Sequence, residues 1–250
     1  MSRSSAGSRQ SAKKRGKGGE RAKRGTAGVK SSINFYPSFD MFGKLRPFEQ
    51  QYFLRLRTSV ADDDIAAIRE AIQAPLNFEM AATDEMIAIA LNTKPNAACI
   101  VPERREEVTT EGGLAVVGNE DRLTDLLSPL KEAGIRLSLF IEANEADIDS
   151  AKRIGADIVE LHTGSYCNDL TKSRAELRRI SRAAAYGANL GIEIHAGHGL
   201  GFDTVGPIAS IPEIEELNIG HFLIGESVFC GLESAITLMR QKMQSSRYGK

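Results

Sequence analysis

The 250-residue chain contains three cysteines, four histidines and no tryptophan. Such a small, odd number of cysteines excludes a disulfide-based fold and is typical of a reducing compartment, so we expect a cytoplasmic protein. No two cysteines have CxxC spacing, which argues against a structural zinc site. No apolar run approaches the roughly 18 residues of a membrane helix, so a membrane-spanning protein is excluded. A hydrophobic content of 42% and a charged content of 26% are typical of a soluble globular protein.

The net charge of −1 conceals a strongly basic N-terminus. Residues 1–30 carry ten Lys and Arg against the single acid Glu20, whereas residues 31–250 carry 22 basic and 32 acidic residues. The segment has almost nothing to bury, so we predict a disordered basic extension over residues 1–30. It is either a tail that contacts nucleic acid through phosphates, a targeting peptide, or an extension without a function. Composition favours the last of these.

From about residue 75 the chain alternates between helical and strand-like segments. Gly134, Gly155 and Gly191 each end a helical pattern, and each is followed by a short apolar run typical of a buried strand. This alternation predicts parallel βαβ units in an α/β fold. The predicted strands lie near 76–80, 97–101, 136–141, 157–161, 191–195 and 216–219, with two more near 32–36 and 51–56.

Eight strands predict a single (β/α)₈ barrel domain, a TIM barrel, over residues 31–250. An open, doubly wound sheet is the alternative. Only residues 37–50 connect the first two predicted strands, so we expect the first βα unit to be atypical or truncated.

Alternation along the predicted strands places ionisable side chains on one face of the sheet. Glu79, Glu160 and His195 share this face with their i±2 neighbours, whereas the intervening residues are apolar. In a barrel the polar face is the interior, and its C-terminal end holds the active site. Buried glutamates and histidines there indicate proton transfer, and the alternative is a set of structural polar groups that satisfy one another.

Two glycine-containing loops follow the last two predicted strands. Residues 197–201 read GHGLG, and residues 218–221 read NIGH. Glycine lets backbone amides approach an anion, so Gly199, Gly220 and His221 are candidate phosphate ligands, with ordinary turn glycines as the alternative. The polar residues 102–113 are either a lid over the site or a solvated loop, and composition favours the loop.

Six motifs occur in order and together resemble the pyridoxine 5'-phosphate synthase family. They occupy residues 77–80, 94–95, 101–113, 160–164, 196–200 and 216–221. The resemblance runs from about residue 62 to residue 243. It implies a (β/α)₈ barrel that condenses 3-amino-2-oxopropyl phosphate with 1-deoxy-D-xylulose 5-phosphate to give pyridoxine 5'-phosphate, phosphate and water. It also implies a cytoplasmic homo-oligomer, often an octamer, with no metal and no organic cofactor.

The resemblance also implies roles for individual residues. Glu79 matches the catalytic proton acceptor, His198 the proton donor, and Glu160 a glutamate that stabilises transition states. Thr109 matches a contact to deoxyxylulose phosphate. Gly199, Gly220 and His221 match contacts to the phosphate of the aminoketone, and they are the glycine-loop residues singled out above.

The N-terminal part departs from the family pattern. The family has an Asn-x-Asp-His motif on its first strand and His-x-Arg at the end of its second, with that histidine a general base. Here no histidine precedes His162, and residues 52–57 read YFLRLR. Two functions therefore stay open, a working synthase and a non-catalytic or impaired homologue that binds phosphorylated ligands. A frameshift that altered residues 1–56 is a third explanation.

Overall fold

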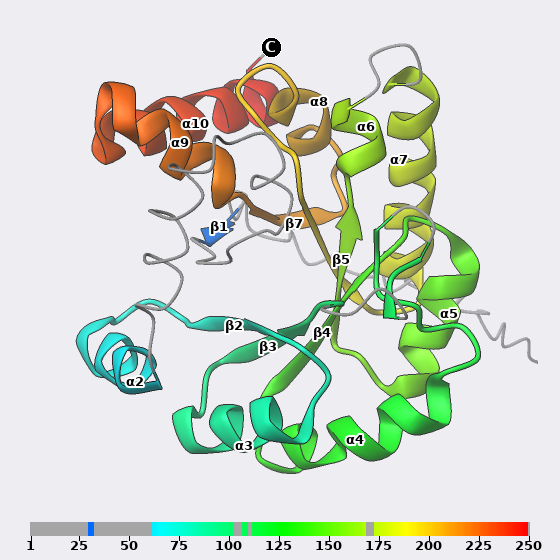
Figure 1. The fold of residues 1–250 in the computed structure, drawn as a ribbon. Coiled ribbons are helices and arrows are strands. Elements are labelled where there is room, and N and C mark those ends of the chain that lie inside the picture. Colours follow the sequence, from blue (N-terminus) through cyan, green and yellow to red (C-terminus); the bar gives the residue numbers. More distant parts are fainter. Residues whose placement is uncertain (1–29, 33–61, 103–106, 110–111, 169–172, 250) are drawn as a thin grey trace, which may run out of the picture.

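The computed structural model describes residues 30–32, 62–102, 107–109, 112–168 and 173–249 (Figure 1). Among these residues, parallel strands form one sheet. The strands are β1 (Lys30–Ser32), β2 (Asn77–Met80), β3 (Ala97–Ile100), β4 (Arg136–Ile141), β5 (Ile158–His162), β6 (Glu193–Gly197) and β7 (Ile214–Asn218).

The described strands from β2 to β7 lie side by side in chain order, and β1 pairs with the outer edge of β7. A doubly wound sheet reverses its strand order at a switch point, whereas this sheet follows the chain without a reversal between β2 and β7. The doubly wound alternative is therefore wrong. The observed architecture is an α/β fold with a parallel, half-barrel sheet.

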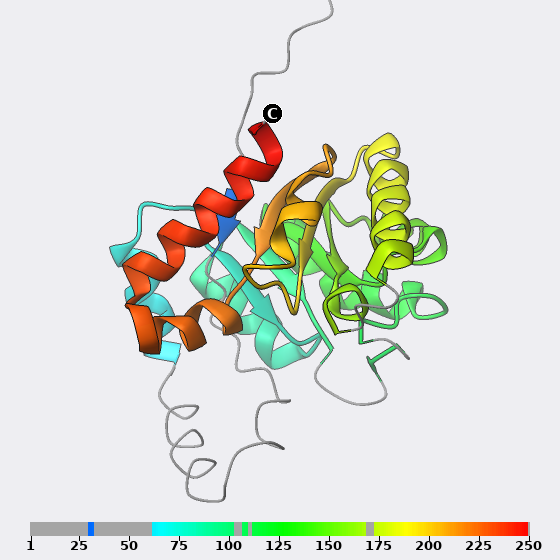
Figure 2. The same cartoon turned by 90° about the horizontal axis from the view of Figure 1, so that it is seen from above.

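Helices cover the outer side of this sheet (Figures 1 and 2). They are α2 (Asp62–Ala71), α3 (Asp84–Thr93), α4 (Glu120–Glu132), α5 (Glu145–Ile154), α6 (Gly164–Asn168), α7 (Ser173–Asn189), α8 (Val205–Ala209), α9 (His221–Cys230) and α10 (Leu232–Tyr248). Neighbours in the chain pack against each other, as α3 does with α4 and α4 with α5. This arrangement leaves the inner face of the sheet for polar side chains.

The predicted glycine caps are confirmed. Gly134, Gly155 and Gly191 have φ values of 76°, 86° and 76°, the left-handed conformation that ends a helix. At the start of α5, the side chain of Asn144 accepts a hydrogen bond from the backbone N–H of Asp147 at 2.9 Å. Asn144 is thus the N-cap that begins this helix.

The predicted alternation of faces is also confirmed. The outward-facing strand residues, such as Ile100, Leu139 and Leu161, are fully buried in the large core between the sheet and its helices. The inward-facing Cys99, Val101 and Phe140 form a separate small cluster. Because successive side chains of a strand point to opposite faces, this division fixes which residues line the inner face.

The boundaries of two strands differ from the prediction by two residues. The run predicted at 191–195 is a strand over Glu193–Gly197, and the run predicted at 216–219 is a strand over Ile214–Asn218. Gly191 ends α7 in a turn whose next residue, Ile192, still belongs to the connection, so the apolar run begins before the strand does.

The N-terminal predictions lie largely outside the described residues. Strand β1 includes Lys30, the last residue of the predicted extension, and overlaps the strand predicted at 32–36 at residue 32. Residues 1–29, the connection 37–50 and the strand predicted at 51–56 lie outside the described residues. Within the part of the chain that the structure covers, no helix has the length and hydropathy to cross a membrane.

The helix caps lead to a prediction about stability. Gly191 and Gly225 both have open space where a Cβ would lie, but only Gly191 has a positive φ. We expect Gly191→Ala to lower the free energy of unfolding by about 1 kcal/mol, because alanine is strained in the left-handed region. Gly225→Ala, inside α9, should raise it by up to about 1 kcal/mol. Urea unfolding measures both, and equal effects would contradict the assigned role of the cap.

Candidate active site

Two carboxyl groups lie on the inner face of the sheet. Glu79 is on β2 and Glu160 on β5, and Glu160 is 6% exposed. Removal from water raises the pKa of Glu79 from its ordinary 4.5 to about 7. Removal from water, followed by the charge of Glu79, raises the pKa of Glu160 from 4.5 to about 8. Because each charge disfavours the other, the pair keeps a proton at neutral pH.

Glu160 is held in place by its neighbours on three strands. Asn218 on β7 donates a hydrogen bond to Oε2 of Glu160 at 2.5 Å, and the Cys99 thiol on β3 donates to the same oxygen at 3.6 Å. A Cβ on Gly197 of β6 would collide with Oε1, so glycine is required there. Burial and the nearby carboxylates raise the pKa of Cys99 well above its ordinary value, so this thiol is a donor and not a nucleophile.

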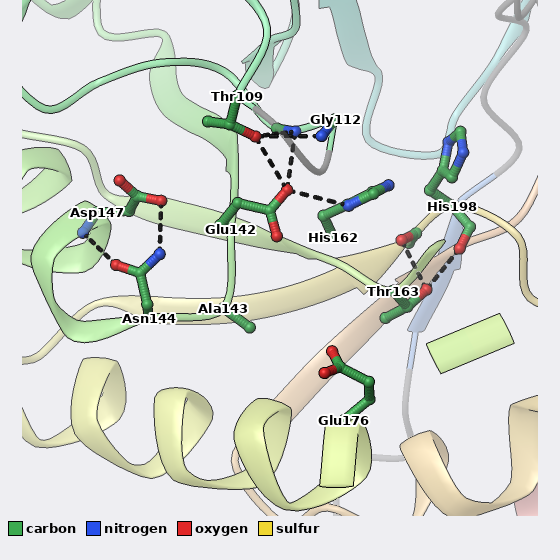
Figure 3. A network of polar contacts seen from close by, with 12 residues as sticks. Thr109, Gly112, Glu142, Ala143, Asn144, Asp147, His162, Thr163, Glu176 and His198 are labelled. Carbon is green, nitrogen blue, oxygen red and sulfur yellow. Dashed lines mark hydrogen bonds and ion pairs between the residues drawn. The ribbon is translucent and has the colours of Figure 1, made fainter. Parts of the chain in front are cut away.

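A second carboxylate centre is Glu142, which directly follows β4 and is 5% exposed (Figure 3). Its Oε1 accepts hydrogen bonds from the backbone N–H of Gly113 at 3.0 Å and from Oγ1 of Thr109 at 3.2 Å. Nδ1 of His162 lies 3.2 Å from the same oxygen, and Nη1 of Arg179 lies 3.5 Å from Oε2. Glu142 therefore connects the loop after β3 with the end of β5 and with helix α7.

His198 lies next to His162 at the C-terminal end of the sheet. The two ring centroids are 4.8 Å apart with an interplanar angle of 52°. The backbone of His198 has φ = 77°, which is rare for a residue with a side chain and costs about 1–3 kcal/mol. Its carbonyl accepts a hydrogen bond from Oγ1 of Thr163 at 2.6 Å, so the strained loop is tied to the strand that carries Glu160.

The candidate phosphate ligands lie in the two loops that follow β6 and β7. Gly199 has φ = 80° and faces Cys167, where a Cβ would come within 3.1 Å of the cysteine Cβ. Gly220 is the N-cap of α9 without a side-chain cap, and His221 is the first residue of that helix. The first backbone N–H groups of a helix attract anions, so this end of α9 suits a phosphate.

Thr109 has a different environment from the one expected of a substrate ligand. Its hydroxyl oxygen accepts hydrogen bonds from the backbone N–H groups of Gly112 at 3.1 Å and Gly113 at 3.0 Å, and its hydroxyl donates to Glu142. Thr109 thus orders the loop that follows β3. The loop predicted at 102–113 is described only at 102, 107–109 and 112–113, and a bridge between Val108 and Leu114 closes that part.

The opposite end of the inner face is a structural ion-pair cluster. Glu193 and His195 share a face, as predicted, and they bind each other at 2.9 Å. Nη2 of Arg136 lies 2.9 Å from Glu193, and the hydrogen bond from His195 is the main reason that the pKa of Glu193 falls to about 2. Glu193 is thus paired with both neighbours, whereas Nδ1 of the buried His195 makes no hydrogen bond among the described residues.

The structure thus brings Glu79 and Glu160 together on the inner face and places His198, Gly199, Gly220 and His221 in the loops above it. Sequence reasoning missed Glu142, Arg179 and Asn218. Glu142 had a recognisable signal, since it is an acid directly after a buried apolar strand. Arg179 gave no signal, because a helix of ordinary charge carries it.

Comparison with known proteins agrees with this arrangement. A family model described as "Pyridoxal phosphate biosynthesis protein PdxJ" matches residues 55–245. The chain belongs to this family. It is 60% identical over 196 residues to the pyridoxine 5'-phosphate synthase of Jannaschia sp. (strain CCS1), an alignment that covers 76% of this chain and 79% of that protein.

Other members of the family are similarly close. The pyridoxine 5'-phosphate synthases of Roseobacter denitrificans and Ruegeria pomeroyi are 55% and 52% identical, again over 76% of this chain and 79% of theirs. The family resemblance inferred from the six motifs is therefore confirmed. The family match starts at residue 55 and leaves out the basic extension and the first predicted strand.

No group of three or more His, Cys, Asp or Glu side chains within the described ranges is arranged to hold a metal ion. Glu160 of the inner face is instead hydrogen-bonded to Asn218.

The raised pKa of Glu160 leads to a prediction about stability and pH. A group whose pKa rises on folding stabilises the protein below its unfolded pKa, and this contribution is lost as the pH rises through the folded pKa. We therefore expect Glu160→Gln to be more stable than the wild type by about 1–3 kcal/mol at pH 8, with little difference at pH 4.5. Urea unfolding at a series of pH values measures the difference.

Glu193→Gln is the matched control, because its pKa is lowered and not raised. Its carboxylate stabilises the fold above pH 4.5, and this contribution is lost as the pH falls toward 2, so the substitution should destabilise the protein at pH 8. A Glu160→Gln variant that is less stable than the wild type at pH 8 would contradict the burial of a costly carboxylate.

Proposed function

We propose that the chain condenses 3-amino-2-oxopropyl phosphate with 1-deoxy-D-xylulose 5-phosphate, giving pyridoxine 5'-phosphate, phosphate and water. The observation that carries this proposal is the buried pair Glu79 and Glu160 beneath the loop of His198. The relatives support it, because each aligned protein is a pyridoxine 5'-phosphate synthase and matches this chain over 76% of its length. The reaction joins the substrates through a new C–N bond and a new C–C bond and releases water and phosphate, with no net oxidation or reduction. Acid–base groups can assist each of these steps, so the proposal includes neither a metal nor an organic cofactor.

Glu79 is the proposed proton acceptor. Ring closure requires that protons leave carbon and nitrogen atoms of the joined substrates near neutral pH. A general base works best when its pKa lies near the working pH, and the pKa of Glu79 is about 7. An ordinary glutamate, with a pKa of 4.5, would be a weaker base.

Glu160 and His198 have complementary proposed roles. The pKa of Glu160 is about 8, so near neutral pH its carboxyl is largely protonated and can donate a hydrogen bond to developing negative charge. Water and phosphate leave as the ring forms, and each leaving oxygen needs a proton. His198, in the strained loop after β6, is the proposed donor of that proton.

The two phosphate groups bind at the loops above the sheet in this proposal. The N-terminus of α9, with Gly220 and His221, and the glycine at position 199 hold the phosphate of the aminoketone. Thr109 is the proposed contact to the deoxyxylulose phosphate. In the structure that hydroxyl is bound to Glu142.

The proposal includes a closed eight-stranded ring. β1 pairs with β7 at one edge of the sheet, and β2 forms the other edge. The strand predicted at 51–56 lies between β1 and β2 in the chain. Inserted between them in space, it would give the strand order of a (β/α)₈ barrel.

The proposed setting follows the family. The substrates are small phosphorylated molecules, and the chain forms a homo-oligomer, which by resemblance to the family is an octamer. The protein is located in the cytoplasm. We propose no membrane partner, and the basic extension is not assigned a nucleic-acid partner.

One observation favours a second function. The first histidine of the chain is His162, so the histidine of the family's His-x-Arg motif has no counterpart. Loss of a general base costs about 10²–10⁴ in rate. A chain without it would retain the phosphate loops and bind phosphorylated ligands without turning them over.

Replacement of the proposed base separates the two functions. We expect the purified full chain to form pyridoxine 5'-phosphate from the two substrates, and Glu79→Gln to lower kcat by about 10²–10⁴. Glu85→Gln is the control, since this exposed glutamate lies on the outer helix α3, and its kcat should be unchanged. Product formation and rescue of a vitamin B6 auxotroph measure the effect. A folded wild type that binds phosphate without turnover would instead support the non-catalytic homologue.

A further inference from the structure

His162 is almost completely buried at the end of β5, and the proposed reaction does not use it. Its side chain is 5% exposed, and its ring lies against both His198 and Phe140, with centroid distances of 4.8 Å and 5.2 Å. The contact with Phe140 is edge-on, at an interplanar angle of 80°. The His162 ring is therefore in contact both with Phe140 and with the ring of His198, the proposed proton donor.

Glu142 fixes the orientation of this ring. Nδ1 of His162 is 3.2 Å from Oε1 of Glu142, which is buried beside Arg179. A buried carboxylate this close to Nδ1 favours the ring orientation that keeps this nitrogen on its side. The same oxygen accepts hydrogen bonds from Thr109 and from the backbone of Gly113, so the anchor is itself held from three directions.

Two glycines make room for the ring. A Cβ at Gly164 would lie 2.6 Å from Nε2 of His162 and 3.1 Å from Cδ2 of His198, and a Cβ at Gly112 would lie 3.1 Å from Cε1 of His162. Both glycines are therefore in contact with the imidazole. Close packing thus surrounds the ring on the side away from its contact with Glu142.

His198 is held from β5 at two points. Thr163 donates a hydrogen bond to the backbone carbonyl of His198. The ring of His162, the residue just before Thr163, contacts the ring of His198. The φ of 77° at His198 persists only while its surroundings hold it. Residues 162 and 163 thus hold the ring and the backbone of His198.

From this geometry we infer that His162, anchored by Glu142, is a positioning residue that holds the imidazole of His198 in the orientation for proton donation. The inference rests on the proposed function, in which His198 is the donor. Glu142 also binds the loop of Thr109, so the position of that loop is mechanically connected to the donor through one carboxylate.

Two substitutions at His162 separate the ring from its anchor. His162→Asn keeps a side-chain donor near Glu142 but removes the ring that contacts His198. His162→Phe keeps a ring but loses the donor. We expect His162→Asn to lower kcat by about 10- to 100-fold, because moving the His198 ring by about 1 Å is enough to slow proton donation this much. KM should change less than about twofold. His162→Phe should lower kcat by a smaller factor.

Tyr186→Phe is the matched control. It removes the hydrogen bond that Tyr186 donates to Asp149 at 2.8 Å on the outer helices, so it tests a loss of stability without a change at the site. Its kcat should equal that of the wild type. A merely structural role for His162 predicts lower thermal stability in both His162 variants with unchanged kcat, and this result would overturn the inference, as would a greater loss in His162→Phe.

Crystal structures of the wild type and of His162→Asn provide a readout that does not depend on activity. We expect the His198 ring to adopt a different rotamer, or more than one, in the variant. An unchanged His198 rotamer would overturn the inference even if the wild type proves inactive. An inactive wild type with a displaced His198 in the variant would contradict the proposed function and still support the positioning role. If His162→Asn does not fold, kcat and the His198 rotamer are measured in His162→Phe, whose ring has no nitrogen to face Glu142. A normal kcat with an unchanged His198 rotamer in this variant would overturn the inference.

Discussion

The cost of removing two carboxylates from water is the constraint on which this site depends. An isolated carboxylate in an apolar interior is so unfavourable that it takes up a proton or finds a partner. Glu160 does both, since its pKa is raised and Asn218 and Cys99 donate hydrogen bonds to it. The glycine at position 197 is a consequence, because any larger residue would displace the carboxyl. The same burial that destabilises the folded chain gives Glu79 a pKa suited to proton transfer near neutral pH.

Polar groups on the inner face form two regions with different chemistry. Toward the N-terminal ends of the strands, His195 is hydrogen-bonded to Glu193 and Arg136 forms an ion pair with it, and both contacts lower the pKa of this glutamate. Within the described residues no lysine or arginine forms an ion pair with Glu79 or Glu160, and the pKa values of both rise. Opposite pKa shifts within one sheet distinguish groups that stabilise the fold from groups that remain able to exchange a proton.

Sequence patterns predicted the sheet well because its periodicity is strong. Alternation placed Glu79 and Glu160 on one face, and the glycines that end α4, α5 and α7 marked where β4, β5 and β6 follow. Contacts between distant residues left no comparable signal. The amide of Asn218 bonds to Glu160, 58 residues away, and Thr109 bonds to Glu142, 33 residues away, and neither pairing follows from local spacing. The predicted start at 191 preceded the strand because the apolar run begins in the connection, whereas β7 begins at Ile214, two residues before its predicted start.

Carbon-13 NMR of the side-chain carboxyl groups tests the central claim most directly. With glutamate labelled at Cδ and the Glu160 signal assigned by comparison with Glu160→Gln, the carboxyl carbon reports its own protonation as the pH changes. The account predicts that Glu160 titrates well above its ordinary 4.5, near pH 8, and that the Glu79 signal changes in the variant. Titration of Glu160 near pH 4.5, independent of Glu79, would contradict the account.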